Sequence, residues 1–168
     1  MLPDLSTTDS RRPVARTALV AVIGAMAVAA LGGTGTELGA WYQSLVQPSW
    51  KPPDTWFGPA WTLIFGLTAW AGTRVWVRAD GPVARRRILG AFGLNGALNV
   101  LWSWIFFRWR SPDWALAEVV LLWLSIVLLI RVSARIDRFA AVLLAPYLGW
   151  VTFAATINVA VVRLNPTA

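Results

Sequence analysis

The chain has 168 residues, of which 57% are hydrophobic and only 14% charged, and its net charge is +7. A soluble domain of this size cannot hide so much apolar surface, so the composition excludes an ordinary soluble protein and indicates a membrane protein. The sequence has no cysteine and no histidine, which excludes disulfides, thiolate chemistry and the usual zinc, copper and non-haem iron sites.

A polar tail, residues 1–16, precedes five apolar segments. Each is close to the roughly 20 residues that cross about 30 Å of hydrocarbon as an α-helix. They are continuously apolar rather than alternating, which excludes the strands of a membrane barrel. We therefore predict an all-α integral membrane protein, a five transmembrane helix bundle formed by a single domain over residues 17–165. The spans are expected at about 17–38, 57–77, 88–107, 114–130 and 139–162, with a long first loop at 39–56.

Lysine and arginine set the expected orientation of the spans. With five spans, the N-terminal tail shares a side with the second and fourth connections, and that side carries 11 basic residues against 4 on the other. The asymmetry predicts a cytoplasmic N-terminus, and it explains the basic charge without nucleic acid. The pair Arg11-Arg12 before an apolar run also resembles a secretory signal, but the run continues into further spans, which favours an uncleaved first helix.

The first predicted helix has small residues at every fourth position, Ala21, Ala25, Ala29 and Gly33. Such spacing lets two helix backbones approach closely. The partner is either another helix of the same bundle or a second copy in a homodimer, and spacing alone does not separate the two.

The loop after this helix reads WYQSLVQPSWKPP over residues 41–53. Its prolines fix their own backbone angle and bias the preceding residue toward extended conformations, so the loop is expected to be stiff. Its aromatic residues give it an apolar side. The sequence predicts a lid and pocket wall over the bundle; the alternative is an aromatic anchor at the membrane interface.

Polar amides and aromatic residues share one face on two predicted helices, at steps of three and four residues. Trp61, Phe65 and Thr68 share a face of the second helix. If the stripes of the third and fifth predicted helices face each other, they would line an apolar cavity with a few polar anchors. The alternative is that these residues pack and form hydrogen bonds within the bundle. The stripe residues are Asn95, Asn99, Trp102 and Phe106 in the third helix and Tyr147, Trp150, Ala154 and Asn158 in the fifth.

Glu118 is a carboxylate inside the fourth predicted span, and such residues are functional candidates by default. The favoured interpretation places it near the start of its helix, where it reaches the interface or the positive end of the helix dipole.

Four stretches of the sequence resemble the TspO/MBR family of bacterial tryptophan-rich sensory proteins and mitochondrial translocator proteins. They occur in the family's order between Gly32 and Asn165. The stretches are WYQSLVQPSWKPP (41–53), FGPAWTL (57–63), LNVLWSWIFF (98–107) and PYLGWVTFAATIN (146–158).

The resemblance implies a five-helix bundle, often a homodimer, with a cavity that opens toward the first loop. It also implies porphyrin, haem, cholesterol or benzodiazepine-site drugs as ligands and a bacterial cytoplasmic membrane as location. Trp41 and Trp50 would lie in the loop above the pocket, and Tyr147 joins the pocket through its stripe. Carried over by motif position, the pocket would include Tyr42, Pro52, Trp61, Phe65, Asn99, Trp102, Phe106, Trp150 and Ala154.

The sequence departs from the family pattern at three places. Asn95 replaces a glutamine, Phe65 replaces a tyrosine, and no tyrosine lies between Asn158 and Arg163 where a cholesterol motif needs one. That motif is weak even when intact, so cholesterol has less weight than a tetrapyrrole. Without histidine or cysteine, a porphyrin is expected to be held by stacking and burial rather than by ligation of its iron.

The predicted function is a receptor or transporter-like protein that binds porphyrin or haem as ligand, with no obligatory cofactor. The sequence offers no acid and base at a catalytic spacing, so ordinary catalysis is not expected. The alternatives are a light-dependent porphyrin-modifying enzyme, a chemistry suggested by the resemblance, and a sensory or regulatory scaffold.

Overall fold

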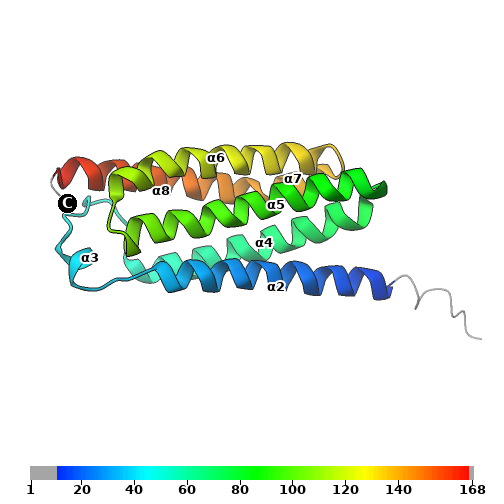
Figure 1. Ribbon diagram of the computed structural model, residues 1–168, viewed down its shortest axis with the longest axis horizontal. Coiled ribbons are helices and arrows are strands. Elements are labelled where there is room, and N and C mark those ends of the chain that lie inside the picture. The colour runs from blue at the N-terminus through cyan, green and yellow to red at the C-terminus, as the bar shows by residue number, and fades with distance from the viewer. Residues whose placement is uncertain (1–10, 167–168) are drawn as a thin grey trace, which may run out of the picture.

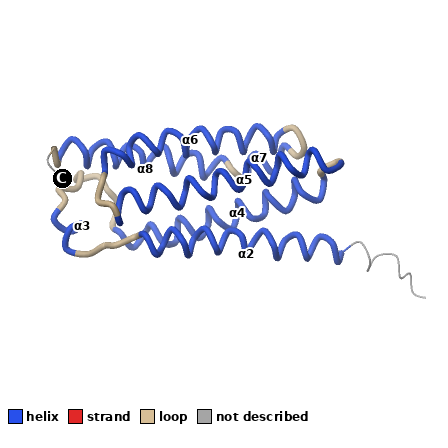
Figure 2. Tube along the Cα trace, in the orientation of Figure 1, coloured by secondary structure: helices blue, strands red, loops and turns tan. Residues whose placement is uncertain are grey.

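The computed structural model describes residues 11–166, and the regular elements within them are helices (Figures 1 and 2). Two short elements lie in the first loop, α3 (Ala40–Ser44) and the 3-10 turn η1 (Asp54–Trp56). The longer elements are α2 (Arg11–Gly35), α4 (Phe57–Arg78), α5 (Gly81–Ser103) with its π-helical continuation η2 (Trp104–Arg108), α6 (Pro112–Ala134), and the pair α7 (Arg138–Leu143) and α8 (Ala145–Leu164).

Four helical stretches within the described residues are long and apolar enough to cross a membrane. They are Val14–Gly35, Gly81–Arg108, Pro112–Ala134 and Arg138–Leu164. These stretches confirm an all-helical, multi-pass membrane protein. The count does not confirm five spans, because α4 is not among the four. Its arginines, threonines and tryptophans lower its hydropathy, although it is a helix of 22 residues.

Proline sets the start of three helices. Pro82, Pro112 and Pro146 lie in the first turns of α5, α6 and α8, where a missing N–H costs no intrahelical hydrogen bond and the fixed backbone angle suits a helix. Next to Pro146, the last helical segment is interrupted at Leu144, between α7 and α8. Proline cannot donate to the carbonyl four residues earlier, so the helix does not run through this point.

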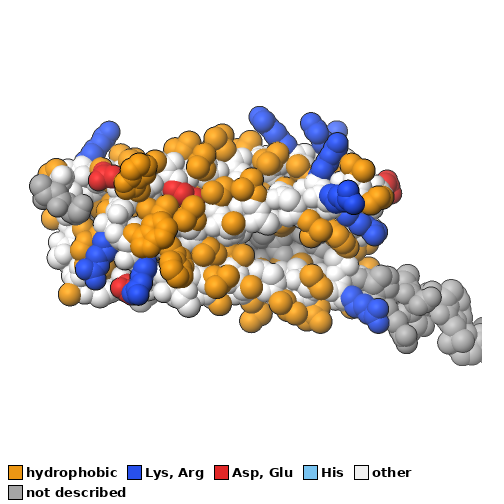
Figure 3. All heavy atoms as spheres, viewed as in Figure 1, with side chains coloured by type: hydrophobic (Ala, Val, Ile, Leu, Met, Phe, Trp, Pro, Cys, Tyr) orange, Lys and Arg blue, Asp and Glu red, His pale blue; other side chains and the backbone are white. Residues whose placement is uncertain are grey.

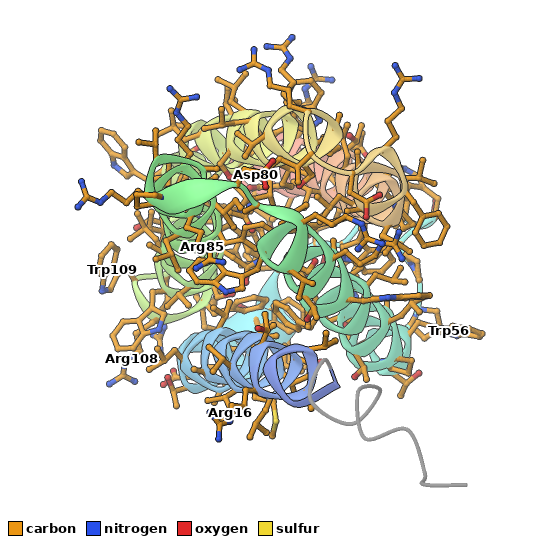
Figure 4. The ribbon with its side chains drawn as sticks, turned by 90° about the vertical axis from the view of Figure 1, so that its right-hand side faces the viewer. Arg16, Trp56, Asp80, Arg85, Arg108 and Trp109 are labelled. Carbon is orange, nitrogen blue, oxygen red and sulfur yellow. The ribbon has the colours of Figure 1, made fainter. Side chains whose placement is uncertain are left out.

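The long helices form a ring. α2 packs on α4 and α5, α5 packs on α6, α6 packs on α7 and α8, and α7 closes the ring onto α4. Figure 4, which views the bundle along its length, shows the helices around a common interior. Apolar side chains cover much of the outer surface of the bundle, and Lys and Arg gather at its two ends (Figure 3). That distribution is the one a lipid bilayer requires of a helical protein.

Glycines bring α2 close to α5 and η2. A Cβ atom on Gly96 would lie 2.9 Å from Val28 Cγ2, and one on Gly35 would lie 2.5 Å from the Trp104 ring. The indole N–H of Trp104 donates to the carbonyl of Leu31 at 2.9 Å. These contacts hold the C-terminal half of α2 against the bundle.

The small residues of α2 do not share one packed face. Ala21 and Ala25 lie on the inner side of the helix, whereas Ala29 and Gly33 are exposed. A four-residue step exceeds the 3.6 residues of one turn, so a strict every-fourth pattern winds around the helix. Only the first half of this pattern therefore faces the inside of the bundle.

Candidate functional site

The first loop is organised around three polar side chains. The buried Tyr42 hydroxyl donates to Asp54 Oδ1 at 2.8 Å, and Lys51 Nζ lies 2.5 Å from the same oxygen. Burial and the hydrogen bond to Asp54 raise the pKa of Tyr42. Burial alone would raise the pKa of Asp54, but the hydrogen bonds from Lys51 and Tyr42 outweigh it and lower that pKa. The three groups hold the start and the end of the loop together.

The same loop is fixed to the bundle by hydrogen bonds and ring contacts. Val46 donates its N–H to Asn165 Oδ1 at 2.9 Å, and Asn165 Nδ2 donates back to the carbonyl of Val46 at 3.0 Å. The Trp41 ring meets Phe106 with a centroid distance of 6.2 Å. Trp50 meets Phe153 of α8 at 6.0 Å. The loop therefore lies across one end of the helix ring, with Trp50 exposed and Pro52 half-buried.

Beneath the loop, the predicted pocket aromatics pack on one another. The Trp102 and Phe106 rings stack at 5.2 Å, and Trp61 and Phe65 stack at 5.3 Å. Trp150 meets the Phe57 ring edge-on at 5.4 Å. Ala154 is half-buried one turn beyond Trp150. Apart from Phe65, these side chains form a filled aromatic core in this structure rather than the wall of an open space.

The polar stripes of α5 and of the last helix do face each other. Asn99 Nδ2 donates to the Tyr147 hydroxyl at 3.0 Å, and both side chains are buried. On the next turn of α5, Asn95 Nδ2 donates to Ser125 Oγ of α6 at 2.9 Å. Asn158 donates to the carbonyl of Pro112 at 3.0 Å, so that amide holds α8 to the start of α6.

A large space lies beside this core, between α2, α4 and α5. The cavity has a volume of about 890 Å³ and extends along α2 from Arg16 to Leu31. The surface is recessed between α2 and α5 on the face drawn in Figure 3. Three of the predicted site residues line it: Phe65, Asn99 and Tyr147.

The other nine predicted residues do not border this cavity: Trp41, Tyr42, Trp50, Pro52, Trp61, Trp102, Phe106, Trp150 and Ala154. Two of them, Trp41 and Tyr42, line a separate space of about 140 Å³ under the loop. The large cavity thus runs along α2, whereas the resemblance implied an opening toward the loop.

The sequence interpretation missed most of the cavity wall. Its α2 side includes the small residues Ala21, Gly24 and Ala25 as well as larger ones such as Val20, and its α5 side includes Gly93 and Gly96. Where two helices carry glycine and alanine side by side but their backbones stay apart, the missing side chains leave space between them. The small residues of α2 and α5 were the one feature of the sequence that could have indicated this cavity. The wall is almost wholly apolar, but the Thr68 hydroxyl is buried there without a hydrogen-bond partner among the described residues.

Comparisons with known proteins agree with this architecture. The sequence profile described as the TspO/MBR family matches residues 17–164. The chain is 39% identical over 147 residues to the tryptophan-rich protein TspO of Chlorobaculum tepidum, covering 84% of this chain and 90% of that one. It is 35% identical to protein CrtK of Rhodobacter capsulatus, with 84% and 89% covered. It is 33% identical to the human translocator protein, with 74% and 75% covered. The chain therefore belongs to the TspO/MBR family.

Proposed function

We propose that this membrane protein binds a porphyrin or haem-type tetrapyrrole in the interior of its helix ring and acts as a receptor or carrier for it. The observation that carries the proposal is the cavity of about 890 Å³ between α2, α4 and α5. Sites for small molecules are usually concave, about 300–1,000 Å³ in volume, mostly apolar, and equipped with a few polar groups. The cavity meets each of these criteria.

The wall of the cavity suits a flat, amphiphilic ring. Phe65 and Phe92 offer aromatic faces for stacking. Thr68, Asn99 and Tyr147 supply polar groups at the inner edge of the cavity. The stacked rings next to it, including Trp61 and Trp102, can serve as a second layer of the site when the core opens to ligand.

One end of the cavity is cationic. Arg16 lines it there, near the start of α2, and Figure 1 shows the starts of α2 and of α5, the helix that carries Arg85, at the same end of the bundle. A tetrapyrrole with two propionates has an apolar ring and an anionic edge. An arginine beside an apolar groove matches that division, since guanidinium groups pair well with carboxylates.

The proposed topology has five spans and a cytoplasmic N-terminus in a bacterial cytoplasmic membrane. α4, the second of the five in chain order, is the span that the hydropathy count leaves out. Its 22 residues reach about 33 Å as a helix, which is enough to cross the hydrocarbon layer. It packs along α2 on one side and α7 on the other. Its polar threonine and small residues face the cavity, which offsets its lower hydropathy. A homodimer formed through exposed helix faces is part of the proposal.

Titration of the purified protein in detergent with protoporphyrin IX tests the function. Quenching of tryptophan fluorescence should saturate at one porphyrin for each chain, since several tryptophans lie in or next to the interior. The control is detergent micelles that contain free tryptophan and no protein, in which quenching grows linearly with porphyrin. The same linear growth without saturation in the protein sample would refute specific binding.

A further inference from the structure

The cavity between α2, α4 and α5 is open on the outer side of the bundle. Val20, Leu31, Leu89 and Leu101 line it, and all four side chains are exposed on the protein surface. Val20 and Leu31 belong to α2, and the other two leucines belong to α5. The recess between these helices is visible in Figure 3. In a membrane this opening faces lipid, so the cavity is also a groove in the lipid-facing surface.

An apolar groove that faces lipid is filled by lipid. An empty space forfeits the dispersion contacts of the atoms around it, which is why proteins and their surroundings are closely packed. Water does not replace those contacts, because it needs several polar partners. Beyond Thr17, the α2 side of the groove carries only apolar side chains as far as Leu31. The apolar groups that a bilayer supplies to such a wall are acyl chains.

The length of the groove suits one acyl chain. From Arg16 to Leu31, α2 rises about 22 Å at 1.5 Å per residue. The hydrocarbon core of a bilayer is about 30 Å thick, so the chains of one leaflet span about 15 Å of it. A chain that starts at the Arg16 end of the groove therefore lies against α2 over its whole length.

The Arg16 end of the groove has two guanidinium groups from different helices. Arg16 of α2 lines the groove directly. Arg85 of α5 lies over the ring of Trp76, 5.4 Å from its centroid, and that ring lines the groove as well. Neither guanidinium group pairs with a carboxylate among residues 11–166. Both charges are therefore available to a ligand.

Acidic side chains do not neutralise this end. The described residues that line the groove include no aspartate or glutamate. Asp137, at the same end of the bundle, pairs with two arginines of α4, and Asp80 is outnumbered by the three arginines at 85–87. Glu118 of α6 is 5% exposed and does not line the groove. It therefore does not reach the interface, contrary to the favoured sequence interpretation.

We propose that the groove binds an anionic phospholipid from the leaflet at its basic end. One acyl chain lies between α2 and α5, and the phosphate group pairs with Arg16 and Arg85. Guanidinium groups pair well with phosphate oxygens, and basic pockets between transmembrane helices suit anionic headgroups. The second chain stays in the bilayer, because the groove is open on its lipid side. A tetrapyrrole that enters the cavity displaces this lipid, but the lipid site does not depend on the proposed function.

The net charge of the headgroup decides which phospholipid binds. Phosphatidylcholine has the same phosphate group but also an ammonium group, which the arginines repel. An ammonium group could bind to an aromatic face, but Arg85 already lies over the Trp76 ring. Phosphatidylglycerol has the phosphate group without a positive charge, so we expect the groove to select it.

Native mass spectrometry of the full chain tests the site. The protein is delipidated in detergent and mixed with equal amounts of palmitoyl-oleoyl phosphatidylglycerol and palmitoyl-oleoyl phosphatidylcholine, which differ only in their headgroups. The parent should retain phosphatidylglycerol about fivefold or more over phosphatidylcholine, because each arginine near an anionic headgroup contributes about a fivefold change in affinity. The double variant Arg16→Gln/Arg85→Gln should retain the two lipids alike. Both side chains are exposed, so this variant is expected to fold.

Two further variants separate the headgroup from the chain. Arg131→Gln/Arg135→Gln removes the same charge at the end of α6, from exposed residues that do not line the groove, and should keep the preference. Gly93→Phe places a ring in the groove, where a Cβ on Gly93 meets nothing within 4 Å. Retention of both lipids should fall by about tenfold in that variant, because ring and chain compete for one space.

Equal retention of the two lipids by the parent would overturn the site, and so would loss of the preference in Arg131→Gln/Arg135→Gln. Preferred retention of added palmitic acid, or a dimer that excludes lipid, would show that a fatty acid or a second copy of the chain occupies the groove instead. No porphyrin is present in these measurements. A protein that binds protoporphyrin without a lipid preference would therefore overturn the lipid site and leave the proposed function standing.

Discussion

Asn99 donates a hydrogen bond of 3.0 Å to the hydroxyl of Tyr147 and so joins α5 to α8 at the inner edge of the cavity. Both side chains are buried although they border the cavity. The pair links the packing of the bundle to the wall of the site, since one bond positions two polar groups that a ligand would meet.

Tyr147→Phe should lower the stability of the protein by roughly 1 kcal/mol, because the change leaves the Asn99 amide buried and unpaired. Asn99→Leu should cost a similar amount for the converse reason. The double variant should cost less than the sum of the two. Thermal unfolding of the four proteins in detergent measures this coupling, and strictly additive losses would show that the two side chains do not depend on each other.

Gly35→Ala should destabilise the protein by about 1–3 kcal/mol through overpacking. The new Cβ would lie 2.5 Å from the Trp104 ring, which is itself held by the carbonyl of Leu31. Gly33→Ala, two residues earlier, is the matched control, because a Cβ there meets nothing within 4 Å.

The control variant should be as stable as the parent or more stable by up to about 1 kcal/mol, because alanine has a higher helix propensity than glycine. Equal melting temperatures for the two variants would mean that α2 does not approach η2 this closely in the folded protein.

The loop over the bundle should be ordered in a defined pH range. The lowered pKa of Asp54 means that its stabilising contacts are complete above its ordinary value near 3.8 and are lost as pH falls through the lowered pKa. Burial alone would lower the pKa of Lys51, but its hydrogen bond to Asp54 outweighs that effect and raises it. The Lys51 contribution is therefore complete below its ordinary value near 10.5 and lost at higher pH.

Hydrogen exchange of the amides in residues 41–53 measures this range. Protection should decline at both extremes of pH, whereas the helices should stay protected. Asp54→Asn should remove the acid-side decline. An unchanged acid-side decline in that variant would show that another group controls the loop.

Arg16 should favour ligands with free carboxylates. The parent is expected to bind protoporphyrin IX up to about fivefold more tightly than its dimethyl ester, the range of an exposed ion pair. Arg16→Gln should bind the two alike, and added salt should reduce the preference in the parent. Arg87→Gln is the control, because that exposed arginine does not line the cavity; loss of the preference there would indicate a general charge effect.

Much of the helical architecture follows from the sequence, because the apolar segments are long and the prolines mark helix starts. The facing amides followed as well: steps of three and four place Asn95 and Asn99 on one side of α5, and the bundle interior is the only place where they find partners. The sequence predicts a span at 57–77, but α4 is not among the helices that are apolar enough to be counted as one. Its arginines and tryptophans resemble those of a helix at a membrane surface, and only its packing between α2 and α7 shows its place in the ring.

The sequence did not allow us to predict which residues line the cavity. Residue patterns identify side chains that meet, such as Trp102 and Phe106, but a cavity depends on where side chains are missing. Gly93 leaves space because the α2 wall of the cavity also carries small residues, Gly24 and Ala25. That alignment is fixed by the register of α2, which close contacts at Gly35 and Gly96 determine.

Filling the cavity is the most direct test of ligand binding inside the helix ring. Gly93 lines the cavity, and a Cβ there meets nothing within 4 Å, so Gly93→Phe should place its ring in the space without disturbing the fold. Gly90→Phe is the matched control on the same helix, since Gly90 is exposed, also meets nothing within 4 Å and lies outside the cavity wall. Protoporphyrin IX affinity should fall by about tenfold or more in Gly93→Phe, as expected when ligand and side chain compete for one space, and should be unchanged in Gly90→Phe. Equal affinities for the two variants would contradict binding in this cavity.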